Sequence, residues 1–597
     1  MSKIISSRLS ALRAEMEKHN YDAYLVPSSD PHQSEYVATR YKSRAWLSGF
    51  TGSMANLVVT KNHAGVWTDA RYFLQAEQEL GGSEVALHKM LVQGAPEHFT
   101  WLNENLAENS RVACDGLLFT VGQVRTLQTT FSAKNIALEY TEDLISKVWT
   151  EDRAKVPQNR IFEHDVKYAG QSRSEKINAI RRKMKSQNAD YHLVSTLDDI
   201  CWTFNLRGND VECNPVFYAY AVIGQEATYL FIEGRKVSAE LKNRLEEDGV
   251  VLQNYDAVSA FLTKIPIEKS ILIDINTTSI FLFNKIKNAK IIEGDTVPLH
   301  LKAIKNETEI NGVRNAMVKD GVALTRAFRW LENTIKKRSI SEVELAQKLT
   351  YFRSKQALYY GESFDAIVGY KGNGAIIHYK PEKETCADIQ NEGVLLIDSG
   401  GQYQDGTTDI TRTICFSEPT AEQKTAYTLV LKGHIGLAML QFPAGTRGIQ
   451  MDILARVHLW QNGLNYGHGT GHGVGCFLNV HEPPQGVITG LATRGTIPHE
   501  IGMLTSNEPG YYKTNEFGIR IENLIIAKKS VENEGVQFYD FETVTYFPID
   551  TRLIDKKLMS AAEKTWFNDY HKMVFEKLSP ELNSAEKNWL QRKCKAL

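Results

Sequence analysis

The stretch GVLLIDSGGQYQDGTTDITRTICF, residues 393–416, has the pattern of a β-hairpin with an acid on each arm. Apolar, β-prone arms flank a turn that contains glycine and aspartate. Asp398 closes the first arm, directly after VLLI, and Asp409 stands in the second arm. Opposed side chains on paired strands lie about 5 Å apart, so this hairpin is predicted to hold two carboxylates across one ladder.

A second stretch, GMLTSNEPGYYKTNEFGIRIENLIIA (502–527), repeats this design about 110 residues later. Its acids are Glu508, at the end of the first arm, and Glu522, within the second. Apolar periodicity predicts two helices before each hairpin, near 307–335 and 341–357 and again near 421–441 and 448–462. Two related hairpins are therefore expected to bring four acids together.

Four clustered carboxylates need counter-charge, because an interior acid without a partner takes up a proton rather than stay charged. Two divalent cations would cancel the four negative charges. An oxygen-rich ligand set with one imidazole favours Mn²⁺ or a similar ion, with Zn²⁺ and Co²⁺ as alternatives. A solvated turn residue is the simpler interpretation of any single acid, but the matched positions in two repeats favour a metal site.

The imidazole is expected from NYGHGTGHGVG, residues 465–475, where His468 and His472 stand four positions apart. This spacing serves on zinc-binding helices. Five of the eleven residues are glycine, however, and each interior glycine costs a helix about 1 kcal/mol relative to alanine. Extended or tightly turned backbone is predicted instead. We assign His472 as the metal ligand and His468 to the substrate.

Other candidate site residues have weaker signals. Arg520 is predicted to share a strand face with Glu522, two residues further on. It could orient that carboxylate, bind substrate or be a surface arginine without a role. His378 in GNGAIIHYKP and His481 in LNVHEPPQG are each flanked by glycine or proline turns, and a lone histidine is more often structural. His434 and His458 lie in predicted helices and are interpreted as packing or surface residues.

The predicted cluster favours amide hydrolysis. Two ions bridged by carboxylates lower the pKa of a shared water and polarise the carbonyl that this water attacks. A serine hydrolase site lacks support, because the sequence has no G-x-S-x-G elbow. A nucleotide-binding loop lacks support as well, because the glycine-rich stretch does not end in G-K-[ST].

The N-terminal half contains an internal repeat. RLSALRAEMEKHNYDAYLV (8–26) recurs as KINAIRRKMKSQNADYHLV (176–194), at a constant offset of 168. Each copy reads as a helix followed by a short apolar strand. Two homologous α/β domains are predicted, residues 1–155 and 156–304, joined by the polar stretch TEDRAKVPQNR (150–160).

A third domain is predicted over residues 305–550, beginning where Asn306 can cap a helix and Glu309 can reach back to the cap. This domain carries both hairpins. Residues 551–597 are expected to form a charged, helical extension without chemistry of its own.

Bulk properties indicate an ordinary globular protein of 597 residues. A net charge of −2, from 69 basic and 71 acidic residues, argues against nucleic acid and membrane as partners. The charged N-terminus lacks a secretory apolar stretch, which predicts a cytoplasmic location. The seven scattered cysteines are expected to be reduced.

Several motifs resemble those of the pita-bread metallopeptidases, and in detail those of the long, three-domain, cytosolic aminopeptidase P (Xaa-Pro aminopeptidase) family. They are DSGGQYQDGTTDITRT, HGTGHGVGCFLNVHEPP, NEPGYY, GIRIEN, AWLSGFTGS, VWTDARYFLQA, FNLRGNDVECNPVF, GAIIHY and LVLKGHIG. The resemblance implies two creatinase-like α/β domains followed by a pita-bread catalytic domain with an internal pseudo-twofold repeat. It also implies a homodimer.

The resemblance assigns roles to residues. Asp398 and Asp409 would bind one ion, Asp409 and Glu522 would bridge, and His472 and Glu508 would complete the second ion's shell. Glu508 would also take a proton from the bridging hydroxide as it attacks. His378, His468 and His481 would bind the substrate and stabilise the tetrahedral intermediate. Arg520 would support the metal ligands from outside the metal shell. Asn507 departs from the family pattern, which has a threonine or similar small residue there.

The implied reaction releases the N-terminal residue from peptides with proline at position two. A prolidase, which cleaves only dipeptides ending in proline, is the nearest alternative. A catalytically inactive peptide-binding module is a third interpretation, although retention of all five ligands argues against it. The native metal, the preferred first residue and the peptide length are left open by the sequence.

Overall fold

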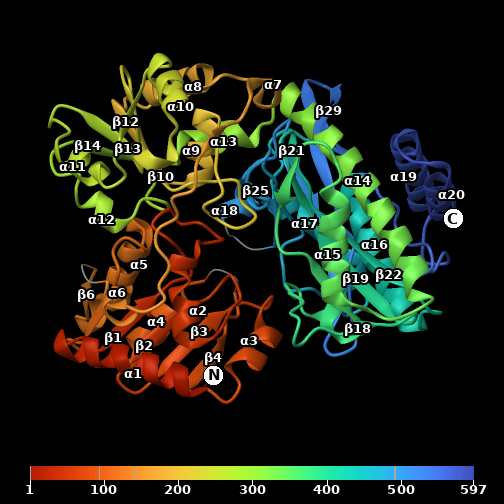
Figure 1. The fold of residues 1–597 in the computed structure, drawn as a ribbon, viewed down its shortest axis with the longest axis horizontal. Helices are drawn as coiled ribbons and strands as arrows, with labels where there is room; N and C mark the ends of the chain where they lie inside the picture. The colour runs from red at the N-terminus through yellow and green to blue at the C-terminus, as the bar shows by residue number, and fades with distance from the viewer. Residues whose placement is uncertain (1, 93–94, 141–142, 490–492) are drawn as a thin grey trace. The chain divides into compact units, whose positions relative to one another are not determined.

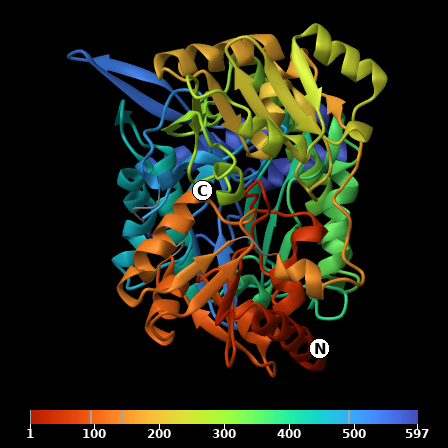
Figure 2. The ribbon, with the colours of Figure 1, turned by 90° about the vertical axis from the view of Figure 1, so that its left-hand side faces the viewer.

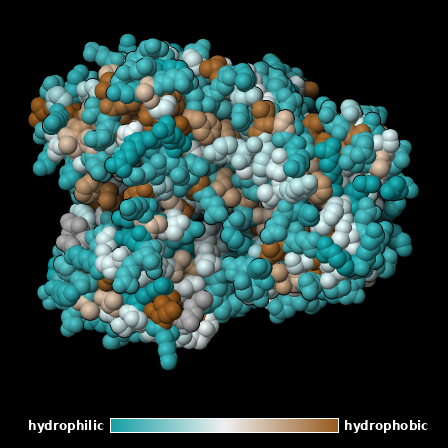
Figure 3. Space-filling model, in the orientation of Figure 1, coloured by the Kyte–Doolittle hydropathy of each residue, from teal (hydrophilic) through white to brown (hydrophobic). Residues whose placement is uncertain are grey.

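The computed structural model describes residues 2–92, 95–140, 143–489 and 493–597. It divides into two compact units, one of residues 1–165 and 171–300 and one of residues 166–170 and 301–597. Figure 3 shows a largely hydrophilic surface with scattered hydrophobic residues on one face of the molecule. Of the helices in the described ranges, none combines the length and the apolar character that crossing a membrane requires.

The first unit contains two six-stranded sheets with the same strand order. One sheet consists of β4 (Val85–Lys89), β3 (Ala64–Thr68), β2 (Asn56–Thr60), β1 (Ala23–Val26), β5 (Arg111–Cys114) and β6 (Ala137–Glu139). The other consists of β12 (Val250–Gln253), β11 (Thr228–Ile232), β10 (Ala219–Gly224), β8 (Tyr191–Val194), β13 (Ser270–Ile273) and β14 (Lys290–Glu293). β1 and β8 are both antiparallel to one neighbour and parallel to the other, which confirms the predicted repeat. Figure 2 shows helices packed on both sheets.

The helices that precede β1 and β8 bury matching residues. Helix α1 (Ser2–Lys18) buries Leu9, Leu12 and Met16, and α8 (Arg173–Ser186) buries Ile177, Ile180 and Met184. Each of these pairs is separated by the offset of 168 residues seen in the sequence. Because burying one such side chain contributes roughly 1.5–3 kcal/mol, the same apolar stripe selects the same helix-on-sheet packing twice.

The second unit is built from two related halves. The first half has helices α14 (Glu307–Ile335) and α15 (Glu342–Arg353) and the sheet β17 (Ile367–Tyr370), β19 (Val394–Ser399) and β22 (Ile410–Cys415). The second half has α16 (Ala421–Ala438), α17 (Gly448–Trp460) and the sheet β23 (Phe442–Pro443), β30 (Val536–Thr543), β29 (Asn523–Asn533), β26 (Leu504–Asn507), β24 (Gly471–Gly473) and β25 (Glu482–Val487). All four predicted helices are present, and Asn306 and Glu309 form the expected capping box on α14.

The chain ends in helices α19 (Ala561–Leu578) and α20 (Ser584–Lys593). Figure 1 shows them at one side of the second unit, where α19 contacts both α14 and α16 and α20 contacts α14. Trp566 and Tyr570 stack with their ring planes 3° apart and face the interior of this unit. The helical extension is thus part of the second unit's core, and Tyr570 also reaches polar groups behind the acids described below.

Candidate metal centre

Each acidic hairpin consists of a ladder followed by a separate pair of tip strands. In the first, β19 pairs with β22, and the tip consists of β20 (Gly401–Tyr403) and β21 (Gly406–Thr407). In the second, β26 pairs with β29, and the tip consists of β27 (Gly510–Lys513) and β28 (Phe517–Arg520). The acids lie where ladder and tip meet, a place at which the backbone leaves regular pairing and side chains can turn toward a common centre.

The register corrects one expectation for the first hairpin. Asp398 stands opposite Thr411, so Asp409, which directly precedes β22, is its diagonal and not its opposed neighbour. In the second hairpin Asn507 stands opposite Asn523, and Glu508 and Glu522 occupy the next position on each arm. Both arrangements keep the two carboxylates of a hairpin at the same end of its ladder.

Hydrogen bonds join the two hairpins to each other. The backbone N–H of Glu522 donates to the carbonyl of Thr411 at 3.2 Å. The Thr413 hydroxyl donates to the Arg520 carbonyl at 3.0 Å and accepts from the Arg520 N–H at 3.1 Å. These contacts place Asp409 beside Glu522, so the two pairs of acids form one cluster, as the sequence predicts.

The cluster includes His472. Asp409, His472 and Glu522 each offer one ligand atom, and these three atoms lie within 4.8 Å of one another. His472 Nε2 is 3.3 Å from Glu508 Oε1 and 3.7 Å from Asp409 Oδ2. Asp398 Oδ1 is buried and has no hydrogen-bond partner in the described part of the chain, as expected for a carboxylate oxygen that binds a cation. The donor set is oxygen-rich with one imidazole, and it fits hard divalent ions.

His472 is held with one ring nitrogen toward the acids. Its Nδ1 lies 2.9 Å from the Gly473 carbonyl, which can only accept, so Nδ1 carries the proton and Nε2 presents its lone pair. The residue belongs to strand β24, where a Cβ on Gly471 would stand 1.9 Å from the Ser506 carbonyl and one on Gly473 would stand 2.3 Å from the Glu482 carbonyl. The glycines are therefore required by close strand packing, and the prediction that the histidines do not lie on a helix is confirmed.

Burial and mutual repulsion perturb the acids strongly. Burial, and then the charges of Glu522 and Asp398, raise the pKa of Asp409 well above its usual range. The pKa of Glu522 is raised for the same kinds of reason, and burial raises the pKa of Glu508 to about 7. Cations in the cluster would reverse this penalty, because metal binding replaces the protons that such groups otherwise hold.

Arg520 supports the cluster from behind, together with a residue that sequence reasoning missed. Its Nη2 donates to Asp398 Oδ2 at 2.7 Å, its Nε to the Thr411 hydroxyl at 3.0 Å and its Nη1 to the Tyr512 hydroxyl at 2.7 Å. The Tyr512 hydroxyl is then free to donate to His468 Nε2, 2.7 Å away. Tyr512 was detectable in principle, since Gly510 pairs with Arg520 and residues two apart share a strand face.

The structure places the other predicted histidines around this cluster. His481 lies with its ring centroid 4.4 Å from that of His472 and precedes Glu482, the partner of Gly473 in β25. His378 follows Ile377, whose carbonyl lies 3.5 Å from Arg520 Nη2. His468 belongs to the tyrosine–arginine chain and not to the ligand group. The three histidines thus come from separate segments, and each is linked to a residue of the cluster or to a direct neighbour of one.

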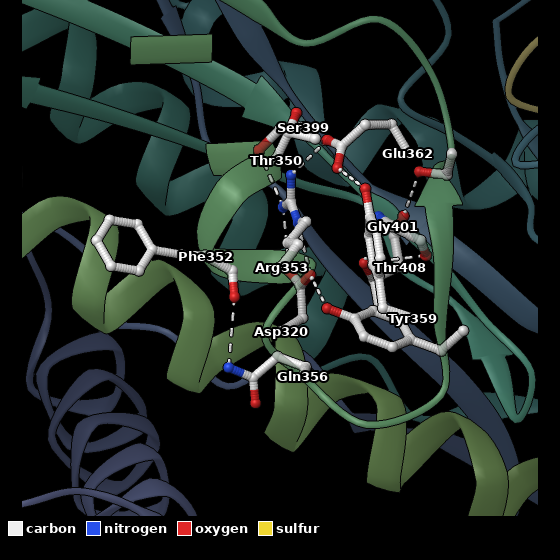
Figure 4. A network of polar contacts seen from close by, with 12 residues as sticks. Asp320, Thr350, Phe352, Arg353, Gln356, Tyr359, Glu362, Ser399, Gly401 and Thr408 are labelled. Atoms are coloured by element: carbon white, nitrogen blue, oxygen red, sulfur yellow. Dashed lines mark hydrogen bonds and ion pairs between the residues drawn. The ribbon is translucent and has the colours of Figure 1, made fainter. Parts of the chain in front are cut away.

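An ionic network reaches Ser399, the residue after Asp398 (Figure 4). Arg353, fully buried at the end of α15, donates to Asp320 Oδ1 at 2.7 Å and to the hydroxyl of Ser399, the residue after Asp398, at 3.0 Å. Its Nη1 also bonds Glu362 at 3.1 Å. Figure 4 shows Arg353 in the centre with these groups pointing toward it, so one guanidinium binds two helices and β19 together.

Replacing Arg353 by methionine is expected to destabilise the protein by about 3–5 kcal/mol, because it leaves two buried acids without their cation. Arg338→Met is the matched control, since the Arg338–Glu344 pair has an arginine side chain that is 53% exposed and should cost under about 1 kcal/mol. Urea unfolding of the two variants measures the difference. Equal losses in both would contradict a special role for Arg353.

Known proteins match the chain along its length. Residues 8–148 and 152–309 each match the Creatinase/Prolidase N-terminal domain, residues 311–529 match Metallopeptidase family M24, and residues 537–597 match the C-terminal region of peptidase M24. A probable Xaa-Pro aminopeptidase P of Laccaria bicolor is 42% identical, over 99% of this chain and 94% of its own. The chain belongs to the aminopeptidase P family.

Other members of this family support the assignment. Aminopeptidase P2 of Arabidopsis thaliana is 39% identical to the chain, over 98% of this chain and 88% of its own. The solved X-prolyl aminopeptidase of Caenorhabditis elegans, described as a cytosolic enzyme with a di-nuclear active site, has a TM-score of 0.95 at 32% identity and covers 99% of this chain and 100% of its own. The predicted fold, two creatinase-like domains and a pita-bread domain, is confirmed by these matches.

Proposed function

We propose that this member of the aminopeptidase P family is a metalloaminopeptidase that removes the N-terminal residue from peptides with proline at position two. One observation carries the proposal: four acids from two related hairpins and one histidine from strand β24 meet in a cluster whose carboxylates repel one another. The names of relatives along the whole chain support the substrate class.

Five residues would hold two divalent cations; the oxygen-rich donor set favours Mn²⁺, with Zn²⁺ and Co²⁺ as alternatives. We assign Asp398 and Asp409 to one ion and His472 and Glu508 to the other. Asp409 and Glu522 would bridge the two ions. This assignment agrees with the positions of their ligand atoms, which lie within 4.8 Å of each other and of the His472 ligand atom. When bound, such cations polarise the scissile carbonyl and acidify a water molecule.

The side chains of this chain would divide the remaining work. Glu508 would accept a proton from the attacking water, since its Oε1 lies within the cluster, 3.3 Å from His472 Nε2, and the Ser506 hydroxyl at 3.2 Å orients it. A carboxylate positioned in this way can serve as a general base. His378, His468 and His481 would contact the peptide, and Arg520 would hold the Asp398 carboxylate in position.

A peptide assay with added Mn²⁺ tests this function. Release of arginine from Arg-Pro-Pro is expected, and Arg-Ala-Pro, which lacks the proline ring at position two, should be cleaved far more slowly. Cleavage of Gly-Pro alone would identify a prolidase instead. A purified protein that carries no divalent ion and gains no activity with Mn²⁺ would support the inactive peptide-binding module.

We also propose a cytoplasmic homodimer. The support is a relative described as cytosolic and the resemblance to a dimeric family. No disulfide joins the cysteines in the described part of the chain, which suits a reducing compartment. Light scattering of the purified protein measures the oligomeric state, and a mass of 67.4 kDa, that of one chain, would exclude the dimer.

A further inference from the structure

His434 of helix α16 lies behind the second acidic hairpin, although its position in a helix suggested only packing or surface exposure. Its side chain is completely buried. It contacts both Asn507 and Asn523, which face each other as the register pair at the end of the β26–β29 ladder. Asn507 directly precedes Glu508, and Asn523 directly follows Glu522.

The hydrogen bonds of His434 have a single consistent direction. Nδ1 lies 3.1 Å from the Asn507 carbonyl, which can only accept, so Nδ1 carries the proton. Nε2 then has a lone pair, and it accepts from the Asn523 amide Nδ2 at 3.1 Å. In return, the Asn507 amide donates to the His434 backbone carbonyl at 2.9 Å. Only a neutral imidazole satisfies this pattern, in agreement with burial, which lowers the pKa of His434 to about 3.

The side-chain oxygen of Asn523, on the side away from His434, is also hydrogen-bonded. Its Oδ1 accepts from Arg412 Nη2 at 2.8 Å, which fixes the orientation of the amide and leaves Nδ2 for His434. Arg412 Nη1 donates to the carbonyl of Glu522 at 2.6 Å, and Arg412 Nη2 to the hydroxyl of Tyr570 on α19 at 2.8 Å. Arg412 thus holds both the carbonyl of Glu522 and the side chain of the residue that follows it.

We propose that His434 is a positioning residue of the metal centre, which sets the separation of Glu508 and Glu522 by joining the residues next to them. This inference rests on the proposed function, since it assigns both glutamates to the ions. The two carboxylates leave the ladder one position beyond the Asn507–Asn523 pair, so a change in the spacing of that pair moves both of them. Groups that orient metal ligands in this way typically change metal affinity 10- to 100-fold when they are lost.

The same contacts explain why an asparagine stands at position 507. Its amide points toward α16, where it bonds the His434 carbonyl, so the departure from the family's small residue serves the link between helix and hairpin. The first hairpin is supported differently, through the hydrogen bond that Arg353 donates to the Ser399 hydroxyl. Loss of His434 should therefore affect the ion held by Glu508 more than the ion held by Asp398.

The test uses the full-length protein and Mn²⁺ alone as the probe. Calorimetric titration of the metal-free protein should show two sites in the wild type. His434→Phe keeps a ring of similar size but no hydrogen bond, and it should weaken one site about 10- to 100-fold and lower kcat with little change in KM. His434→Asn retains an amide donor for the Asn507 carbonyl and should recover part of the affinity.

His458→Phe, on the neighbouring helix α17, is the matched control and should bind both ions like the wild type. A folded His434→Phe variant with two sites of wild-type affinity would overturn the inference. If that variant does not fold, Asn523→Ala removes the same link from the other side, and wild-type affinity there overturns the inference equally. A wild-type protein that binds no Mn²⁺ would instead refute the proposed function.

Discussion

Asp409→Ala is expected to remove both cations together and to lower kcat/KM at least about 1,000-fold, which corresponds to roughly 4 kcal/mol of lost transition-state stabilisation. The proposal assigns Asp409 as a ligand of both ions, since Asp409 belongs to the first hairpin and its ligand atom lies within 4.8 Å of those of His472 and Glu522 from the second half. A bridging ligand contributes to both ions, so its loss cannot empty one site alone.

Metal analysis of the dialysed protein measures this outcome directly. Asp405→Asn is the matched control, because Asp405 lies in the tip of the same hairpin but forms an ion pair with Lys319 at 2.5 Å. That variant should retain two ions per chain. One tightly bound ion per chain in Asp409→Ala would show that Asp409 does not bridge.

The second large effect is expected for Glu508→Gln, which should lower kcat about 100- to 10,000-fold by removal of the general base. The amide has nearly the same shape, so the Ser506 hydroxyl keeps an acceptor, but it cannot take up a proton. The ion assigned to Asp398 and Asp409 should be retained. Substrate binding, measured as KM or as the affinity of a non-hydrolysed peptide, should change much less than kcat.

Glu516→Gln provides the control for this substitution. Glu516 lies in the turn of the second hairpin's tip and forms an ion pair with Lys513 at 3.0 Å, away from the acids. It should have wild-type kcat. If Glu508→Gln keeps kcat within tenfold of wild type at full metal occupancy, another group must accept the proton.

Much of the fold could be predicted because the repeats are visible in the chain itself. The 168-residue offset aligns Leu9 with Ile177 and Met16 with Met184, and the structure buries all four on matching helices. The four helices that precede the acidic hairpins and the capping box at Asn306 follow from apolar periodicity and local hydrogen-bond chemistry. These signals depend only on residues close together in the sequence, so one sequence is enough to detect them.

The register within the first hairpin was not accessible in this way. The expectation that Asp398 opposes Asp409 was wrong, because the tip strands β20 and β21 take up residues that a simple hairpin would place in the ladder. Register depends on where a turn begins and ends, and one residue of difference changes which side chains face each other.

The sequence by itself determined the two repeats, the identity of the acids and the histidine, and the extended backbone around His472, because each rests on local spacing and on the cost of glycine in a helix. Only the tertiary structure decided what stands behind those ligands. Tyr512, Arg353, Arg412 and His434 come from segments far apart in the chain, and they act through hydrogen bonds that form only once the strands and helices pack. Such contacts leave no periodic signal, since a buried polar side chain is recognised by the partner that satisfies it and not by its neighbours in sequence.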